Sequence, residues 1–285
     1  MKAQLIDGKL ISAEIKAEAA EEAAALKEQG IEPCLAVVLV GDNSASKVYV
    51  SNKQKACEAV GIKSVSHVLS GETTEEELLK LIDELNADKS VHGILVQMPV
   101  PKHIDDRKVI MAISPDKDVD CFHPVNVGYL HTGAKGFLPC TPAGIIELIK
   151  RSGHSIAGKN CVVIGRSNIV GKPVAMLLMQ ENGTVTICHS KTQDLAGICR
   201  GADIIVSATG KVDTVTADMV KEGAIIIDVG MNRNAEGKLC GDVDFENVKE
   251  VAGAITPVPG GVGPMTIAML MKNCNTAARI QNGLL

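Results

Sequence analysis

Aromatic residues are scarce in this 285-residue chain, which has no tryptophan, two tyrosines and three phenylalanines. So few rings leave little surface on which nucleic-acid bases stack, and a net charge of −5 gives the chain no overall basic character. The sequence also lacks a continuous apolar run of about 18 residues, the length that a membrane helix needs. We therefore expect an aliphatic core and a small-molecule ligand, with no nucleic acid or membrane as partner.

Paired cysteines are missing as well. The nine cysteines are scattered without a Cys-x-x-Cys pair, and an odd number lying largely in apolar runs is typical of reduced core thiols in the cytoplasm. The seven histidines have no ligand spacing such as His-x-x-x-His, so no metal site is predicted. The first nine residues are too polar for a secretory signal, and we expect a cytoplasmic protein.

Apolar runs and amphipathic segments alternate along the first half of the chain. This pattern predicts parallel β-α-β units, with helices over 12–29, 44–60, 73–86 and 105–112 and strands over 34–40, 63–69 and 91–97. A loop rich in charge and glycine is expected over 114–136. A helix over 143–151 follows, and the domain boundary is placed near it.

A second α/β series follows, with strands over 161–164, 184–188, 203–207 and 224–229 and helices over 170–180 and 192–199. The last helix, over 264–281, comes after this series is complete, and we expect it to cross back to the first domain. The sequence thus predicts an α/β protein of two domains. One consists of residues 1–140 plus 265–285, and the other of residues 141–264.

Three polar side chains lie at helical spacing just past the first predicted strand. Ser46, Tyr49 and Lys53 occupy positions i, i+3 and i+7 of one helix and share a face. Ligands of open α/β sheets bind beyond the carboxyl ends of the strands, so this face is a candidate for chemistry. A solvated helix face is the alternative, since most lysines are simply exposed.

The segment 165–171 is a candidate nucleotide-binding turn. It follows a short buried strand and precedes a helix, and glycine at such a turn lets backbone N–H groups approach a pyrophosphate. Ser167 stands where the middle glycine of Gly-x-Gly-x-x-Gly is usual. An ordinary β-α turn therefore remains the alternative.

The next strand end distinguishes the two nicotinamide cofactors. An NAD site uses an acidic residue there for the ribose 2′-hydroxyl, whereas this chain has His189, Ser190, Lys191 and Thr192. Hydroxyl and cationic groups suit a 2′-phosphate, and Arg166 is placed to help, so NADP is favoured over NAD. Ser190 and Thr192 also suit a helix N-cap, a role compatible with anion binding.

Small residues end two further strands, at 207–211 and 228–232. They leave room for a nicotinamide and its ribose close to the backbone, although they are equally typical of simple turns.

Taken together, these segments resemble the bifunctional methylenetetrahydrofolate dehydrogenase/cyclohydrolase family. The resemblance covers nearly the whole chain. It is carried by residues 40–53, 93–99, 115–120, 139–142, 165–173, 188–192 and 255–266. The last of these, Ile-Thr-Pro-Val-Pro-Gly-Gly-Val-Gly-Pro-Met-Thr, is long and unusual, and several such blocks in one order are far more specific than a single glycine pattern.

The resemblance implies a three-layer α/β catalytic domain at the amino terminus and a Rossmann-type NADP-binding domain, with a folate cleft between them, usually in a homodimer. The family oxidises 5,10-methylenetetrahydrofolate with NADP and hydrolyses the methenyl product to 10-formyltetrahydrofolate, within one-carbon metabolism and purine biosynthesis.

Matched motif by motif, Lys53 would be the catalytic lysine, Gln97 its partner, Tyr49 the neighbour that positions the folate, and Asp120 the carboxylate that holds the pterin. Cys121 departs from the pattern, since the family often has glycine there, and this puts the conformation of the loop in question. The implied cofactor-binding residues are Gly165, Arg166, Ser167, Ile169, Ser190, Thr209 and Gly230. The implied substrate-binding residues are Ser46, Tyr49, Asp120, Pro259, Gly260 and Gly261.

These residue types suit the two reactions. Hydride transfer needs no acid, only contact between donor and acceptor. Hydration of the methenyl cation needs a group that removes a proton from water and later returns one to a ring nitrogen. Burial and a cationic substrate both disfavour an ammonium, so Lys53 is the candidate for that group. For Asp120 a role as a loop-capping acid is the alternative.

Two other functions compete with this interpretation. One is a different two-domain NADP dehydrogenase, acting on a hydroxy acid or a shikimate-like substrate. The other is a non-catalytic binder of folate or NADP. An assay of methenyl formation and decay distinguishes all three.

Overall fold

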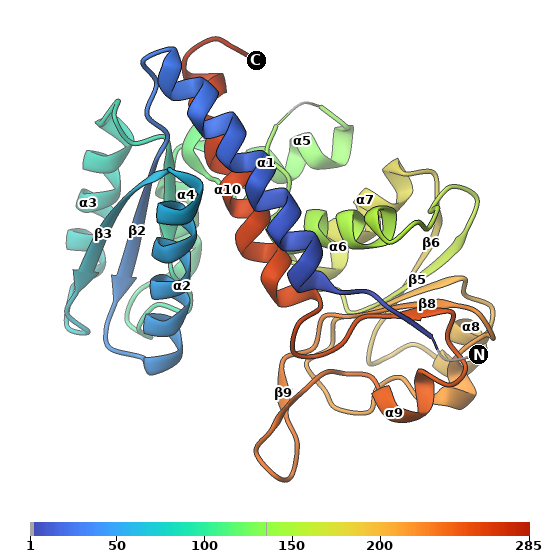
Figure 1. Ribbon diagram of the computed structural model, residues 1–285. Coiled ribbons are helices and arrows are strands. Elements are labelled where there is room, and N and C mark those ends of the chain that lie inside the picture. Colours follow the sequence, from blue (N-terminus) through green and yellow to red (C-terminus); the bar gives the residue numbers. More distant parts are fainter. Residues whose placement is uncertain (1–2, 135) are drawn as a thin grey trace. The chain divides into compact units, whose positions relative to one another are not determined.

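The computed structural model describes residues 3–134 and 136–285. Two compact units make up the chain, each assembled from separate stretches of sequence (Figure 1). Residues 14–140 and 267–285 form one, called here the three-strand unit, and residues 1–13 and 141–266 form the other, the six-strand unit. Within the described ranges, no helix is long and apolar enough to cross a bilayer.

The three-strand unit is built on a parallel sheet with the order β3-β2-β4. The central strand β2 (Cys34–Val40) is buried at every position between β3 (Lys63–Leu69) and β4 (Gly93–Val96). A central strand of a parallel sheet is covered on both faces, which explains its unbroken apolar run.

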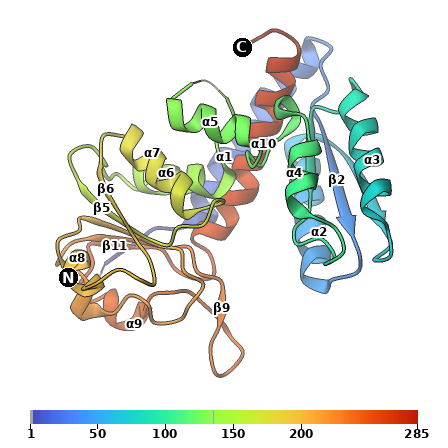
Figure 2. The ribbon, with the colours of Figure 1, turned by 180° about the vertical axis from the view of Figure 1, so that it is seen from behind.

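Helices cover both faces of this sheet. The core formed by Ala36 and Val38 of β2 includes buried side chains of α3 (Glu75–Ala87) and α4 (Asp106–Ala112). Two views show α2 (Ser44–Val60) on the opposite face from α4 (Figures 1 and 2). The unit therefore has the three layers that the family resemblance implies.

The six-strand unit is a parallel sheet with the order β1-β11-β8-β7-β5-β6. Its strands are β1 (Gln4–Leu5), β5 (Asn160–Ile164), β6 (Thr184–Cys188), β7 (Ile204–Ser207), β8 (Ile225–Asp228) and β11 (Ala254–Ile255). The chain runs from β5 outward to β6 and then returns past β5 to β7. The direction of winding thus reverses between β5 and β7, and the ligand crevice of such sheets lies beyond the carboxyl ends of the strands at this point.

Helices and a small hairpin complete the chain. The remaining helices are α1 (Gly8–Glu28), α5 (Pro124–Thr132), α6 (Cys140–Arg151), α7 (Gly171–Gln180), α8 (Leu195–Arg200), α9 (Phe245–Val248) and α10 (Val262–Gln281), with 3-10 turns at Pro115–Lys117 and Ala217–Met219 and an antiparallel pair β9 (Asn232–Arg233) and β10 (Leu239–Cys240). The boundaries between the two units fall inside α1, α6 and α10. All nine cysteines are free thiols, and eight of them are buried.

The expected loop over 114–136 is wrong, because the segment contains a 3-10 turn and the helix α5. Pro124 occupies the first turn of α5, where its missing N–H is not needed. The Nδ1 atom of His123 accepts a hydrogen bond from the N–H of Val125 (3.2 Å), and Gly133 ends the helix in the left-handed conformation. Proline and glycine, which indicate a loop, here mark the two ends of a short helix.

The first 13 residues also differ from expectation, since they belong to the six-strand unit rather than to the domain that follows them. Gln4 and Leu5 pair with Ala254 and Ile255 of β11. A strand of two residues has no periodicity, so the sequence gives no signal of this pairing.

Candidate active site

Lys53 lies on α2, on the side of the helix that carries Val50 and Cys57 into the core. Its Nζ atom donates a hydrogen bond to Oε1 of Gln97 over 2.9 Å. Lys53 itself is half-buried, and it lies three and four residues from its two buried neighbours, so helical periodicity directs it inward. The alternative of a fully solvated lysine is wrong.

The other two members of the predicted helix face differ in exposure. Ser46 is buried, and the Tyr49 residue is 43% exposed. Asn43 fixes the start of this face, because its side chain accepts a hydrogen bond from the N–H of Ser46 (3.1 Å). Tyr49 thus lies at the edge of the face, where its ring is open to a ligand.

Gln97 follows directly after β4, at the carboxyl end of the strand. Its Nε2 atom donates to the carbonyl oxygen of Met98 over 2.7 Å. That bond leaves Oε1 to face the amine of Lys53. The backbone of the chain therefore orients the amide as a hydrogen-bond acceptor for the lysine.

Asp120 is the third member of this cluster. It is half-buried, and burial raises the pKa of its carboxyl group above the ordinary value, while the nearby charge of Lys53 opposes this rise. The buried thiol of Cys140 lies 3.9 Å from its Oδ1 atom. Burial raises the pKa of the Cys140 thiol well above its usual value, so the thiol keeps the proton that it directs at Asp120.

Two residues outside the predicted set of site residues hold the segment on either side of Asp120. The carboxylate of Asp118 is buried and accepts hydrogen bonds from the N–H groups of Phe122 (3.2 Å) and His123 (2.8 Å). The Nδ2 atom of Asn273, on α10, donates to the carbonyl oxygens of Val119 (2.7 Å) and Leu138 (2.8 Å). The loop that presents Asp120 is thus fixed by contacts far apart in sequence.

Cys121, the departure from the family pattern, has φ +61°. This is the left-handed region that glycine adopts without penalty, which explains why glycine is common at the position. The thiol donates to the carbonyl oxygen of Phe137 over 3.2 Å. The loop therefore keeps a glycine-like backbone although the residue carries a side chain.

A cavity of about 670 Å³ opens in the six-strand unit at the carboxyl ends of β5, β6 and β7. We call it the carboxyl-end cavity. Five of the seven implied cofactor residues line it, whereas Ile169 and Gly230 do not. It is lined by Ile164, Gly165, Arg166, Ser167, His189, Ser190, Leu195, Ala208, Thr209, Lys211, Val212, Asp213 and Thr214.

The turn after β5 requires its glycines. Gly165 has φ +128°, and a Cβ atom there would lie 2.3 Å from the carbonyl oxygen of Ala208, at the end of β7. A Cβ atom on Gly171 would lie 2.3 Å from the carbonyl oxygen of Gly165. Ser167, at the middle glycine position, accepts hydrogen bonds from the N–H groups of Val170 and Gly171 (both 3.2 Å). The side chain of Ser167 thus stabilises the turn that leads into α7.

The segment after β6 matches the expectation only in part. Ser190 lines the carboxyl-end cavity together with Arg166. Thr192 does not begin a helix, because its Oγ1 atom accepts from the N–H of His189 (2.8 Å) and closes a turn. The helix α8 begins later, where Asp194 accepts from the N–H of Gly197 (3.0 Å). The guanidinium of Arg166 and the hydroxyl of Ser190 fit the phosphates of NADP, and the end of β6 carries no acidic residue.

The implied substrate residues Pro259, Gly260 and Gly261 belong to the six-strand unit. Gly260 has φ +107°, and a Cβ atom on Gly8, at the start of α1, would lie 1.8 Å from the carbonyl oxygen of Gly261. This loop is therefore packed tightly against the first turn of α1.

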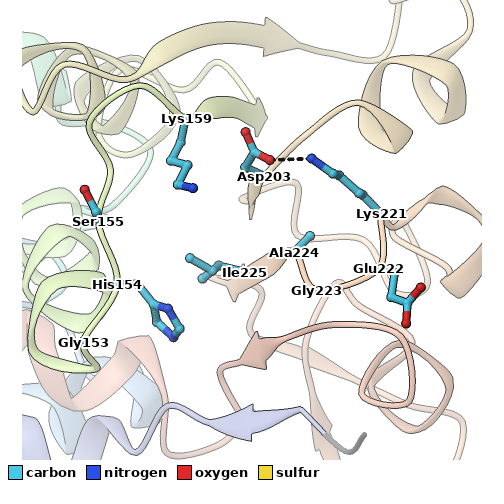
Figure 3. A pocket seen from close by; sticks show the side chains of 10 residues that line it. All are labelled: Gly153, His154, Ser155, Lys159, Asp203, Lys221, Glu222, Gly223, Ala224 and Ile225. Carbon is cyan, nitrogen blue, oxygen red and sulfur yellow. Dashed lines mark hydrogen bonds and ion pairs between the residues drawn. The ribbon is translucent and has the colours of Figure 1, made fainter.

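A second cavity, of about 320 Å³, opens at the opposite edge of the six-strand sheet, where β5, β7 and β8 begin (Figure 3). Two of its lining residues, Lys221 and Asp203, form an ion pair at 2.6 Å. None of the residues implied by the sequence lines it. Because parallel sheets bind ligands at the carboxyl ends of their strands, the carboxyl-end cavity is the candidate nucleotide site.

Comparison with known proteins identifies relatives over the whole chain. Residues 6–120 match the model of the tetrahydrofolate dehydrogenase/cyclohydrolase catalytic domain, and residues 139–282 match that of the NAD(P)-binding domain. The bifunctional protein FolD of Agathobacter rectalis is 63% identical over 277 residues, which are 97% of this chain and 99% of that protein.

Solved structures agree with this result. The bifunctional enzyme FolD of Campylobacter jejuni, a methylenetetrahydrofolate dehydrogenase/cyclohydrolase, superposes with a TM-score of 0.95 at 54% identity, covering 98% of this chain and 99% of that one. The enzyme of Trypanosoma brucei, in complex with NADP and an inhibitor, superposes with a TM-score of 0.92 at 41% identity, covering 98% of each chain. The chain belongs to the tetrahydrofolate dehydrogenase/cyclohydrolase family.

Proposed function

We propose that the Nζ atom of Lys53 moves the protons in a bifunctional folate reaction. The chain oxidises 5,10-methylenetetrahydrofolate with NADP and hydrolyses the methenyl product to 10-formyltetrahydrofolate. One observation carries the assignment of the lysine, namely the 2.9 Å hydrogen bond between its amine and Oε1 of Gln97. It joins the predicted helix face to the carboxyl end of the strand β4, and α/β proteins bind ligands at the carboxyl ends of their strands.

For the oxidation we assign binding and orientation to the protein. NADP, when bound, supplies the hydride acceptor. In our proposal Arg166 and Ser190 hold its 2′-phosphate, since both line the carboxyl-end cavity, and Gly165 allows the turn after β5 to approach the pyrophosphate. Because hydride departure leaves a cation stabilised by two folate nitrogens, no side chain is asked to donate or accept a proton in this step.

For the hydrolysis we assign the proton transfers to Lys53. The cationic methenyl substrate disfavours the ammonium form, so the amine is neutral and accepts a proton from the attacking water. The resulting ammonium then donates that proton to the departing ring nitrogen. As the carbon–nitrogen bond breaks and the formyl C=O forms, the hydroxyl of the adduct loses the second water proton to solvent, so each hydrolysed methenyl cation releases one proton. Gln97 accepts a hydrogen bond from the amine and supplies no charge. A neutral partner leaves the lysine free to gain and lose its proton.

We assign the pterin ring to Asp120. Its carboxylate supplies paired acceptors that match the amide and amino donors at the edge of a pterin. Burial makes an unpartnered carboxylate unfavourable, so donors of the substrate stabilise it strongly.

The assignment of Lys53 is tested by replacing it with methionine. Lys53→Met keeps the length and apolar stem of the side chain but removes the proton carrier, so we expect hydrolysis of added methenyltetrahydrofolate to be abolished. Lys55→Met, at an exposed position of the same helix, is the matched control and should keep both activities. The assay follows methenyl formation and decay spectrophotometrically with NADP and with NAD. Near-normal hydrolysis by Lys53→Met refutes the assignment.

The assignment of Asp120 makes a separate prediction. Asp120→Ala should weaken folate binding by about tenfold or more, the effect of losing a charge-assisted hydrogen bond, and should leave NADP affinity nearly unchanged. Calorimetric titration of each ligand measures the two affinities separately. Equal losses for both ligands would indicate general destabilisation instead of a pterin contact.

We further propose that folate binds chiefly to the three-strand unit and NADP to the six-strand unit, in a cytoplasmic homodimer that supplies formyl groups for purine biosynthesis. Ser46, Tyr49, Pro259, Gly260 and Gly261 complete the assigned folate contacts, and Ile169, Thr209 and Gly230 the NADP contacts. Light scattering coupled to gel filtration tests the dimer, since a monomer mass at working concentration would contradict it.

A further inference from the structure

The carboxylate of Asp242 connects several segments at the carboxyl edge of the six-strand sheet. The Asp242 residue is completely buried. Within the described residues it accepts six hydrogen bonds, which come from backbone N–H groups and from polar side chains. Oδ2 accepts from Ser207 Oγ (3.1 Å), Thr209 N (2.7 Å), Thr209 Oγ1 (2.9 Å) and Gly210 N (3.2 Å), and Oδ1 accepts from Lys211 N (3.0 Å) and Asn232 Nδ2 (2.9 Å).

Three consecutive backbone N–H groups, those of Thr209, Gly210 and Lys211, converge on this single carboxylate. Successive N–H groups arranged in this way form a nest that binds anions. Here the nest is filled by an anion of the chain itself. Its donors are therefore engaged before any ligand binds, and their task is to hold the loop.

The loop held by Asp242 is one wall of the carboxyl-end cavity. Thr209, Lys211 and Thr214 line that cavity, and the backbone oxygen of Asp242 also accepts from the N–H of Thr214 (2.7 Å). One residue thus fixes both the beginning and the end of this wall. Asp242 itself does not line the cavity.

Glycines make room for this arrangement. A Cβ atom on Gly230 would lie 2.2 Å from Oδ1 of Asp242, and one on Gly241 would lie 1.8 Å from Oδ2 of Asp228, the neighbouring buried acid. Asp228 in turn accepts from the N–H of Asp242 over 2.9 Å. The close approach of these side chains to glycine backbone specifies one position for the Asp242 carboxylate.

We propose that Asp242 is a positioning residue for the cofactor, which acts by holding the loop of residues 207–214 in the shape that receives the nicotinamide nucleotide. The inference rests on the proposed NADP site. Asp242 does not line the cavity, and the role assigned to it is to preorganise one wall of that site.

The test measures KM for NADP and kcat separately in Asp242→Asn and Asp242→Ala. Asparagine keeps one oxygen acceptor but turns an NH2 group toward N–H donors, so KM for NADP should rise about tenfold. Alanine removes both oxygen acceptors and should raise KM further. Hydrolysis of added methenyltetrahydrofolate, which consumes no NADP, should stay within about twofold of the original rate. If the alanine variant fails to fold, the asparagine variant decides.

Asp244→Asn is the matched control, because this carboxylate lies in the same segment but accepts from Asn247 alone among the described side chains, over 2.7 Å. It should leave KM for NADP unchanged. The inference is overturned if Asp242→Asn keeps the original KM, or if it lowers both reactions equally. An original protein that does not reduce NADP would instead overturn the proposed function, so the two failures are distinguishable.

Discussion

At the scale of single residues, the proposed role of Lys53 depends on the amide of Gln97, which accepts a hydrogen bond from its amine. A carboxylate at this position would stabilise the ammonium of Lys53 as an ion pair, whereas an amide oxygen accepts its hydrogen bond without adding charge. The bond from Nε2 of Gln97 to the carbonyl oxygen of Met98 prevents the amide from presenting a donor to the amine. An uncharged acceptor in a fixed orientation is what a lysine needs if it is to change its protonation state.

Gln97→Glu should therefore slow hydrolysis at neutral pH by about tenfold or more, since a carboxylate at hydrogen-bond distance favours the ammonium by at least one order of magnitude. Raising the pH removes the extra proton, so the pH of half-maximal hydrolysis should move upward. Rates of methenyl hydrolysis from pH 6 to pH 9 measure the shift. A pH profile that is lower but not displaced would contradict the proposed proton transfer.

At the scale of elements, α2 is a rigid support for the amine. Its ends are fixed by Asn43, which caps the first turn, and by Gly61, which has φ +81° and ends the helix. Val50 and Cys57 anchor the same helix in the core of the three-strand unit. The direction of Lys53 thus depends on caps and packing that contain no catalytic group.

Asn43→Ala should cost about 1 kcal/mol of unfolding free energy, the usual effect of losing an N-cap. Because the cap holds the N–H of Ser46, we also expect KM for folate to rise more than kcat falls. Urea unfolding and steady-state kinetics measure the two effects. Asn52→Ala, the same change at an exposed interior position of α2, is the control, and a similar loss in both variants would exclude a capping effect.

At the scale of the whole molecule, stability depends on a buried acid at the edge of the six-strand sheet. Asp228 is 3% exposed, and burial raises the pKa of its carboxyl group to about 6, with the neighbouring Asp242 adding to the rise. Three backbone N–H groups that donate to it oppose the shift without cancelling it. The folded protein therefore binds this proton more tightly than the unfolded chain does.

The sign of the pH effect follows from this raised pKa. The stabilisation by the protonated carboxyl is complete below its unfolded pKa, near 4, and is lost as the pH rises through about 6. A shift of about 2 pH units corresponds to about 3 kcal/mol. Urea unfolding of the original protein and of Asp228→Asn at each pH measures the effect. Between pH 4 and pH 7 the original protein should lose up to about 3 kcal/mol of unfolding free energy relative to the variant. A constant difference across this range would show that Asp228 has an ordinary pKa.

The sequence by itself determined the elements with strong periodicity or clear caps. The helix 44–60 and the strands 34–40, 63–69 and 184–188 match the structure residue for residue, because apolar spacing and a cap or glycine stop specify them locally. The motifs also identified the family, and the predicted pair of Lys53 and Gln97 is joined by a hydrogen bond.

Only the tertiary structure decided which distant segments meet. The two-residue strand β1, near the start of the sequence, pairs with β11, near its end. Asn273 of α10 holds the loop around Asp120, and Asp242 holds the loop after β7. None of these residues belongs to a periodic pattern, because their partners are set by the packing of the sheet and not by neighbours in sequence. Local interactions determine an element, whereas the position of a buried polar group follows from where several elements end together.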